Sequence, residues 1–351
     1  MLRSLHRRPR GRALARALDR VSNGRVAAPA PPPAWPSTRR EGLDLLLREP
    51  PASGPAQSEA TAQLYARLSP GDLDLLDQRL TDEQRALLES ASEEHRRQVT
   101  LALAVHHGIM GGTGLSTAEP PDDVHSTGRG PLAAGGSYHH ADLVLEALRR
   151  GGLDPSVELR GLDFGCSSGR VVRVLHAVLP QIEWHACDPN AGAIEWAGSN
   201  LHGIRFSTSP QEPPLPYADG AFDFAYAISI WSHFGEGAAL RWLREMHRLI
   251  PRGGLLVITT HGFQSLSYFG ARNLWPLERL RPVAQELYTC GFAYRDLFGE
   301  EGDFGVKGAE WGMAFLTPEW LLARATPSWA VAWHAPGRVE ENQDVYVLVR
   351  R

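Results

Sequence analysis

From about residue 158 onward, short apolar segments alternate with longer segments in which apolar and charged positions follow the period of a helix. The apolar segments predict strands over 157–165, 182–190, 204–208, 221–230 and 255–260. The helical pattern predicts helices over 168–179, 191–201 and 237–250. This alternation predicts an α/β fold with a mostly parallel, doubly wound sheet, in which a ligand binds beyond the carboxyl ends of the strands.

Ahead of this region, residues 41–115 show a helical pattern. Within the segment 80–109, Thr81 and Gln84 have the spacing of a capping box, and apolar residues with charges between them form a stripe. The segment 110–136 is rich in Gly, Pro and Asp and predicts a loop, and loops of this length are often lids or binding loops. We therefore expect a helical region and loop over 41–130 and one main domain over 131–351.

The first 40 residues differ from the rest in charge. They hold ten arginines against one acid, a net of +9, and since the whole chain carries −4, residues 41–351 sum to −13. A transit peptide and an arm that binds anionic polymers or lipid are two interpretations. The single lysine against 35 arginines favours a third, a disordered, proline-rich leader in a GC-rich bacterial gene.

Length and cysteine content narrow the class further. At 351 residues the chain is long enough for one large domain or two modest ones, and no apolar stretch approaches the roughly 20 residues of a membrane helix. The three cysteines are too scattered for a disulfide framework or a CxxC metal site, which favours a reducing cytoplasm. No metal site is expected at the histidine pairs 106–107 and 139–140, because no carboxylate or cysteine joins them at ligand spacing.

The turn after the first predicted strand carries the candidate chemistry. Asp163 ends that strand, and Gly165 and Gly169 flank a cysteine and two serines before the next helix begins. Gly165 allows the backbone to approach a ligand closely, and Gly169 allows the helix to pack near the strand. Asp188 ends the second strand, where a carboxylate can accept both hydroxyls of a ribose.

Missing motifs exclude two kinds of phosphate-bearing cofactor, nicotinamide dinucleotides and the nucleotides that a P-loop binds. The turn lacks the G-x-G-x-x-G triplet of nicotinamide dinucleotide sites, and no Gly-Lys-Ser or Gly-Lys-Thr P-loop occurs. The Tyr-x-x-x-Lys pair of a short-chain dehydrogenase cannot exist, because Lys307 is the only lysine and Asp303 lies four residues before it. A cofactor with ribose but no phosphates remains.

Five segments between residues 162 and 351 occur in the order of the motifs of one family. They are "LDFGCSSG", "ACDPN", "PPLPYADGAFDFAYAISIWSHF", "LIPRGGLLVITT" and "QDVYVLVRR". Over roughly residues 135–351 the chain resembles the class I S-adenosylmethionine-dependent methyltransferases. The resemblance implies a Rossmann-like, seven-stranded, mostly parallel sheet with an antiparallel edge strand, and S-adenosylmethionine as the cofactor.

The resemblance also implies cofactor-binding residues, which are Asp163, Gly165, Cys166, Ser167, Gly169, Asp188, Gln211 and Ser229. At the position where many members carry an Asp for the adenine amine, this chain reads Ser209, Pro210, Gln211 and Glu212. Either Gln211 or Glu212 is a candidate for that contact.

Two histidines are candidates for a general base. His233 follows the fourth strand and His261 the fifth, so both are expected at the same edge of the sheet. For each of them a structural role is the alternative, and Trp231 is expected to be an apolar wall. The segment 262–318 is expected to be an insertion that covers the acceptor, with a small core of its own and a mobile lid that carries Lys307.

Two classes of function stay open at this point. The first is methyl transfer to a small-molecule or glycan acceptor, with a hydroxyl preferred over an amine because the histidines offer a base. The second is a regulatory protein that keeps the cofactor fold and docks a partner through its helical N-terminal part. Nucleic acid is disfavoured as a partner, because residues 41–351 are acidic and no Asp/Asn-Pro-Pro-Tyr/Phe motif occurs.

Overall fold

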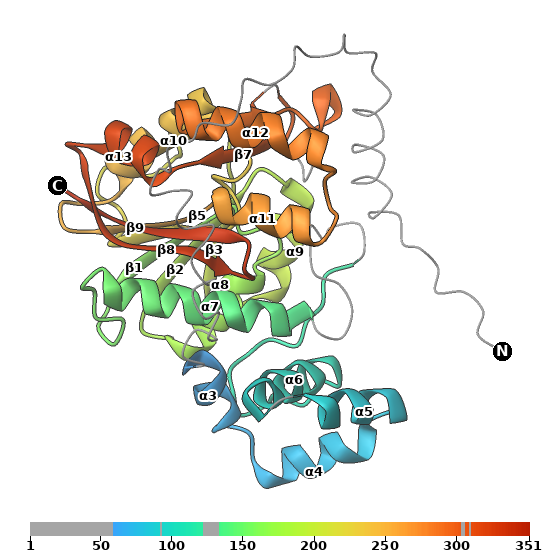
Figure 1. Ribbon diagram of the computed structural model, residues 1–351. Coiled ribbons are helices and arrows are strands. Elements are labelled where there is room, and N and C mark those ends of the chain that lie inside the picture. The colour runs from blue at the N-terminus through green and yellow to red at the C-terminus, as the bar shows by residue number, and fades with distance from the viewer. Residues whose placement is uncertain (1–58, 92, 122–132, 303–305, 309) are drawn as a thin grey trace.

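The computed structural model of the protein describes residues 59–91, 93–121, 133–302, 306–308 and 310–351. Figure 1 shows the arrangement of its helices and strands. The expected leader over 1–40 lies outside the described residues, and so does part of the expected lid, residues 303–305 and 309.

Within the described residues, four helices precede the main domain: α3 (Glu59–Tyr65), α4 (Pro70–Arg79), α5 (Asp82–Ser90) and α6 (Glu93–His106). The predicted capping box is confirmed, since the amide of Gln84 donates to Thr81 Oγ1 at 3.2 Å and the amide of Thr81 donates to Gln84 Oε1 at 3.1 Å. The helical pattern over 80–109 forms two helices, α5 and α6. Helix α7 (Ala133–Arg150) follows them.

Helix α7 joins these helices to the main domain (Figure 1). Its buried Asp142 accepts a hydrogen bond from the amide of Ala60 at 2.6 Å and another from Thr61 Oγ1 at 3.4 Å, so it caps the first turn of α3 from a neighbouring helix. Two turns further along α7, Arg149 pairs with Glu59. Burial raises the pKa of Asp142 to about 7, although the two hydrogen bonds act in the opposite direction.

The main domain is built on one sheet. Its strands are β1 (Arg160–Phe164), β2 (Glu183–Asp188), β3 (Ile204–Thr208), β4 (Phe224–Ala227), β5 (Leu255–His261), β6 (Phe292–Arg295), β7 (Met313–Leu316), β8 (Trp329–Val339) and β9 (Gln343–Arg350). Hydrogen-bonded neighbours follow the order β3-β2-β1-β4-β5-β7-β6, and β9 pairs with β5 and β8. Strands β1 to β5 are parallel to one another.

The expected α/β sheet with an antiparallel edge is confirmed, with two strands more than the seven expected. Strand β9 pairs antiparallel with β5 along its whole length, and β8 pairs antiparallel with β9. The extra strands are the hairpin β6–β7, which belongs to the insertion. Strand β7 meets β5 only where His261 pairs with Phe315, beyond the last residue pair between β4 and β5.

Helices cover both faces of the sheet because its central strands are apolar on both sides. In β5, Leu255 and Val257 face the core formed with α7 and α8 (Arg170–Val178), while Leu256 and Ile258 face the core formed with α10 (Glu236–Leu249) and α13 (Pro318–Ala325). Helix α9 (Ala191–Asn200) joins the first of these cores.

The insertion has a small core of its own, as expected. It consists of α11 (Phe263–Ala271), α12 (Leu277–Cys290), the 3₁₀ helix η1 (Gly299–Glu301) and the hairpin β6–β7. Phe269 and Trp275 pack against Phe315 of β7, with ring centroids 6.0 and 5.9 Å from it.

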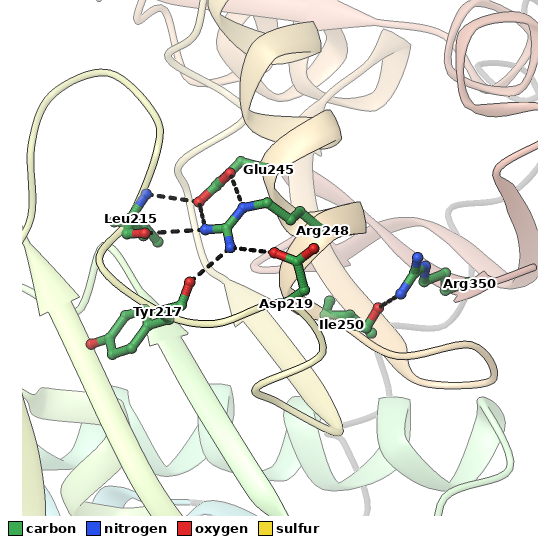
Figure 2. Close-up of polar contacts among 7 residues, drawn as sticks. All are labelled: Leu215, Tyr217, Asp219, Glu245, Arg248, Ile250 and Arg350. Carbon is green, nitrogen blue, oxygen red and sulfur yellow. Dashed lines mark hydrogen bonds and ion pairs between the residues drawn. The ribbon is translucent and has the colours of Figure 1, made fainter.

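Arg248 of α10 holds the part of the β3–β4 loop around Leu215 and Asp219 against that helix (Figure 2). Arg248 donates to the carbonyl oxygens of Leu215 and Tyr217 at 3.1 and 2.7 Å, and to Asp219 Oδ1 at 2.8 Å. Glu245, which is buried, accepts from Arg248 at 2.7 Å and from the amide of Leu215 at 2.7 Å. These bonds fix the loop whose first residues reach the carboxyl end of the sheet.

Candidate functional site

A cavity of about 470 Å³ lies at the carboxyl ends of β1, β2 and β4, where the fold predicts a ligand. The sheet side supplies Asp163, Asp188 and Ser229 to its lining, and the turn after β1 supplies the segment 164–167. The insertion contributes Val306 and Trp311, and the β8–β9 turn with the strand ends beside it contributes Val339, Glu340, Asn342 and Gln343. All of the cofactor-binding residues expected from the sequence, except Gly169, therefore line one cavity.

The turn after β1 has a left-handed backbone at three of its five residues. Gly165, Ser167 and Gly169 have φ angles of 84°, 50° and 75°. A Cβ atom on Gly165 would lie 2.2 Å from Ile230 Cδ1, and one on Gly169 would lie 2.8 Å from Leu201 Cδ1. Both glycines are therefore required by close approach as well as by backbone conformation, and Gly169 begins α8 without lining the cavity.

Asp188 connects this turn to the end of β2. One carboxylate oxygen accepts from the amide of Ser167 at 2.8 Å, and the other accepts from the amide of Asn190 at 2.8 Å. Each oxygen keeps a lone pair for a ligand. Burial raises the pKa of Asp188 to about 6, and burial together with the nearby charge of Asp188 raises the pKa of Asp163 to about 7.

The two candidates for an adenine contact are separated by the structure. Gln211 lines the cavity, and its Oε1 accepts from the amide of Lys307 at 3.0 Å. Glu212 turns away, where its carboxylate accepts from Arg241 at 2.7 and 2.9 Å. Of the two, Gln211 is therefore the one that can reach a ligand in the cavity, and the Lys307 side chain is exposed.

His233 lines the cavity with a fixed orientation. Its Nδ1 lies 2.7 Å from the carbonyl oxygen of Gly312, which can only accept, so Nδ1 carries the proton and Nε2 keeps a lone pair. The ring stacks on Trp311 with centroids 4.7 Å apart. Burial lowers the pKa of His233, so the imidazole is neutral at pH 7.

The structure does not bring His261 to the cavity. The His261 side chain is 4% exposed and packs between Phe269 and Phe315. Its Nε2 lies 3.4 Å from the side-chain amide nitrogen, Nε2, of Gln343. Burial lowers its pKa to about 3. Trp231, expected to be an apolar wall, is buried between Phe164 and Phe234 and does not line the cavity either.

Several cavity residues were not anticipated. They are His140 of α7, Arg170 at the start of α8, and Glu340, Asn342 and Gln343 around the β8–β9 turn. Arg170 directly follows the predicted turn, so its position was visible in the sequence. The other four come from elements that only the three-dimensional fold brings to this edge.

The described residues contain neither a metal site nor a membrane-spanning helix. No group of three His, Cys, Asp or Glu side chains within the described residues is placed to hold a metal ion. No helix in the described part of the chain is long and apolar enough to cross a membrane.

Residues 162–254 match a family described as a methyltransferase domain. The chain carries a methyltransferase domain. Its fold is the one that binds S-adenosylmethionine, and the expected cofactor and enzyme class are confirmed: the protein is an S-adenosylmethionine-dependent methyltransferase. No curated protein sequence matches the methyltransferase.

Solved structures with a related fold have low sequence identity to the methyltransferase. The PH0226 protein of Pyrococcus horikoshii OT3 is 15% identical, with 61% of this chain and 91% of that chain covered and a TM-score of 0.42. An S-adenosylmethionine-dependent methyltransferase of Clostridium acetobutylicum ATCC 824 is 9% identical, with 60% and 90% covered and a TM-score of 0.40. PKMT2 of Rickettsia typhi, solved with AdoHcy, is 10% identical, with 58% and 52% covered and a TM-score of 0.38.

Proposed function

We propose that the methyltransferase transfers a methyl group to a hydroxyl of a small molecule or glycan, with His233 as the general base. The observation that carries this proposal is the fixed tautomer of His233 at the cavity wall. The carbonyl oxygen of Gly312 holds the Nδ1 proton, and the lone pair of Nε2 is left to accept a proton from an acceptor.

The cofactor assignment rests on three features of the cavity. Asp188 offers one remaining lone pair on each carboxylate oxygen, which suits the two hydroxyls of a ribose. The buried Oδ2 of Asp163 makes no hydrogen bond of ordinary geometry within the described residues, which suits the ammonium group of the methionine part. Gln211, which lines the same cavity, is assigned to the adenine amine.

His233 and its neighbours then account for the transfer. When bound, S-adenosylmethionine supplies the methyl group from its sulfonium. Nε2 of His233 would take the proton of the acceptor hydroxyl, whose oxygen would receive the methyl group that the cofactor supplies, and Asp163, Asp188 and Gln211 would hold that cofactor. Because the displacement is in line, holding the acceptor about 3–3.5 Å from the methyl group supplies much of the rate.

The acceptor side of the cavity is aromatic as well as polar. Trp311 and Phe234 line it, and both rings belong to the buried core between the insertion and α10. Flat apolar rings beside a histidine suit the apolar face of a sugar or another ring that carries a hydroxyl. This combination favours a hydroxyl-bearing ring over a charged polymer.

The test is methyl transfer by the purified full chain. S-adenosylmethionine is supplied with a panel of hydroxyl-bearing sugars and phenols, and with matched amines, and the products are detected by mass spectrometry. We expect transfer to at least one hydroxyl compound. His233→Gln should then lower kcat by roughly 10²–10⁴-fold while the Kd for the cofactor stays near that of the wild type.

The matched control is His202→Gln, because His202 is an exposed histidine outside the cavity. This variant should keep the wild-type kcat. Activity confined to amines would overturn the hydroxyl assignment, and an unchanged kcat in His233→Gln would exclude His233 as the base.

A further inference from the structure

A hydrogen-bonded network lies beneath the cavity at the ends of β4, β5 and β9. Gln343 of β9 pairs directly with His261 of β5, so their side chains share one face of the sheet with Thr259, two residues before His261. Ser229 follows β4 and lines the cavity above them. These four residues, which we call the strand-end network, link the buried His261 to the cavity wall.

The donors and acceptors of the hydrogen bonds in the strand-end network can be assigned from the groups present. Gln343 Oε1 accepts from Thr259 Oγ1 at 2.6 Å and from Ser229 Oγ at 3.1 Å. Thr259 Oγ1 in turn accepts from the amide of Ser229 at 2.7 Å. With Oε1 engaged in this way, the amide group of Gln343 donates toward Nε2 of His261, 3.4 Å away. His261 is neutral at physiological pH, so its Nε2 can accept.

The network holds a strained residue. Ser229 has a φ of 60°, in the left-handed region that residues other than glycine seldom adopt. Both its amide and its hydroxyl are bonded to the network, on Thr259 and Gln343 respectively. Its neighbours Ile228 and Ile230 line the cavity too, and Ile230 contacts the space above Gly165. The conformation of Ser229 therefore shapes the wall against which the cofactor turn lies.

We propose that His261 is a positioning residue that orients the side-chain amide of Gln343. Gln343 and Thr259 then hold Ser229 in its left-handed conformation, which keeps the cavity in the shape that binds the cofactor. The role differs from that of a base, because His261 does not line the cavity and its Nε2 lone pair faces Gln343. The proposal rests on the placement of the cofactor in this cavity, and it is independent of the acceptor and of His233.

Removing a member of the network should lower the fraction of molecules whose cavity is shaped for the cofactor. The apparent affinity falls by that same fraction. We expect Gln343→Met, which keeps the length of the side chain, to weaken binding of S-adenosylhomocysteine roughly five- to twentyfold. His261→Phe should act in the same direction, and phenylalanine suits a site between Phe269 and Phe315.

A second substitution distinguishes positioning from a general loss of structure. Glycine adopts a φ of 60° without strain, so Ser229→Gly removes the need for the network. Added to Gln343→Met or to His261→Phe, it should restore the Kd for S-adenosylhomocysteine to within about threefold of the wild type. Isothermal titration calorimetry on the full chain measures each Kd, and thermal unfolding shows that each variant is folded. If Gln343→Met does not fold, His261→Phe carries the same test.

The matched control is His334→Phe, because His334 is a partly buried histidine of β8 that stacks on Tyr346 and does not line the cavity. Its Kd should equal that of the wild type. An unchanged Kd in both network variants, or a weakened Kd that Ser229→Gly does not restore, overturns the proposal. So does loss of the low-pH limb of the activity profile in His261→Phe, which would make His261 the base. Because calorimetry needs no acceptor, the proposal can fail or stand whether or not hydroxyl methylation is found.

Discussion

Replacing Asp188 with asparagine tests the cofactor site with the least damage to the turn around it. The carboxylate accepts one backbone amide on each oxygen, from Ser167 and from Asn190. Alanine would leave both amides without an acceptor, and Ser167 already has a φ of 50°. Asparagine keeps one acceptor and the volume of the side chain, so the change in ligand binding is easier to interpret.

The expected magnitude follows from the bonds that are lost. Asp188→Asn removes the charge and turns one acceptor into a donor, so at least one ribose hydroxyl loses a charge-assisted hydrogen bond worth about 1.5–3 kcal/mol. Since 1.4 kcal/mol is a factor of ten, the Kd for S-adenosylhomocysteine should rise roughly 10- to 100-fold. Asp188→Ala should weaken binding at least as much.

Although Asp188→Asn should weaken cofactor binding, it should not lower the stability of the ligand-free protein. The pKa of Asp188 in the folded protein is about 6, above the value of 3.8 that an aspartate has in an unfolded chain. Between these values the folded state binds more protons than the unfolded state, so the free energy of unfolding falls as the pH rises through this window. At pH 8 the ionised carboxylate therefore destabilises the fold, and asparagine, which has no charge to bury, should keep or raise the Tm.

Calorimetry and thermal unfolding at pH 8 check both expectations. Asp223→Asn is the matched control, because Asp223 accepts the amide of Arg160 at 2.7 Å at the opposite edge of the sheet. It should leave the Kd unchanged. A folded Asp188→Asn variant with a Kd within twofold of the wild type would refute the assignment of Asp188 to the ribose.

Three further predictions follow from the described contacts. Cofactor affinity should rise between pH 5 and pH 8, because both carboxylates are ionised only above the raised pKa values of Asp163, about 7, and Asp188, about 6. Calorimetry across this range should show a shallower rise in Asp163→Asn. Arg248→Met should lower the free energy of unfolding by roughly 2–4 kcal/mol, since it leaves a buried carboxylate unpaired, whereas Arg252→Met at an exposed site should change the Tm little. A chain that begins at residue 41 should keep the Tm and the cofactor affinity, because no apolar period ties residues 1–40 to the core; a large loss of either would show that they belong to the fold.

The alternating pattern predicted the centre of the fold well because each of its signals is local. The strands β1 to β5 and the helices between them lie where apolar segments and helical periods place them. Less could be said of the insertion, whose hairpin β6–β7 joins the sheet through a single residue pair, His261 with Phe315. A contact between residues so far apart in sequence leaves no periodic trace.

The contrast between local signals and contacts of distant residues also applies to the site, where the turn after β1 was predictable and the strand-end network was not. Asp163, Gly165 and Asp188 belong to one strand–turn–helix–strand segment, so their spacing alone indicated a ribose-bearing ligand. Gln343 leaves no such signal, because its partners Ser229 and Thr259 are more than eighty residues away along the chain. His261 shows the limit of the argument from strand order, since the end of a strand places a residue at the correct edge without deciding whether it faces the cavity.

His233, the proposed base, and Asp188, the proposed ribose contact, are held by different parts of the methyltransferase. Trp311 of the insertion stacks on the His233 ring, and the carbonyl oxygen of Gly312 accepts a hydrogen bond from its Nδ1–H. Glu310, just before them, accepts from the amide of Ala238 at the start of α10 at 3.0 Å. None of these contacts involves the turn after β1. A change at Trp311 or Gly312 is therefore expected to shift His233 first. It should lower kcat more than it weakens cofactor binding, because Asp188 and the turn after β1 bond to neither residue.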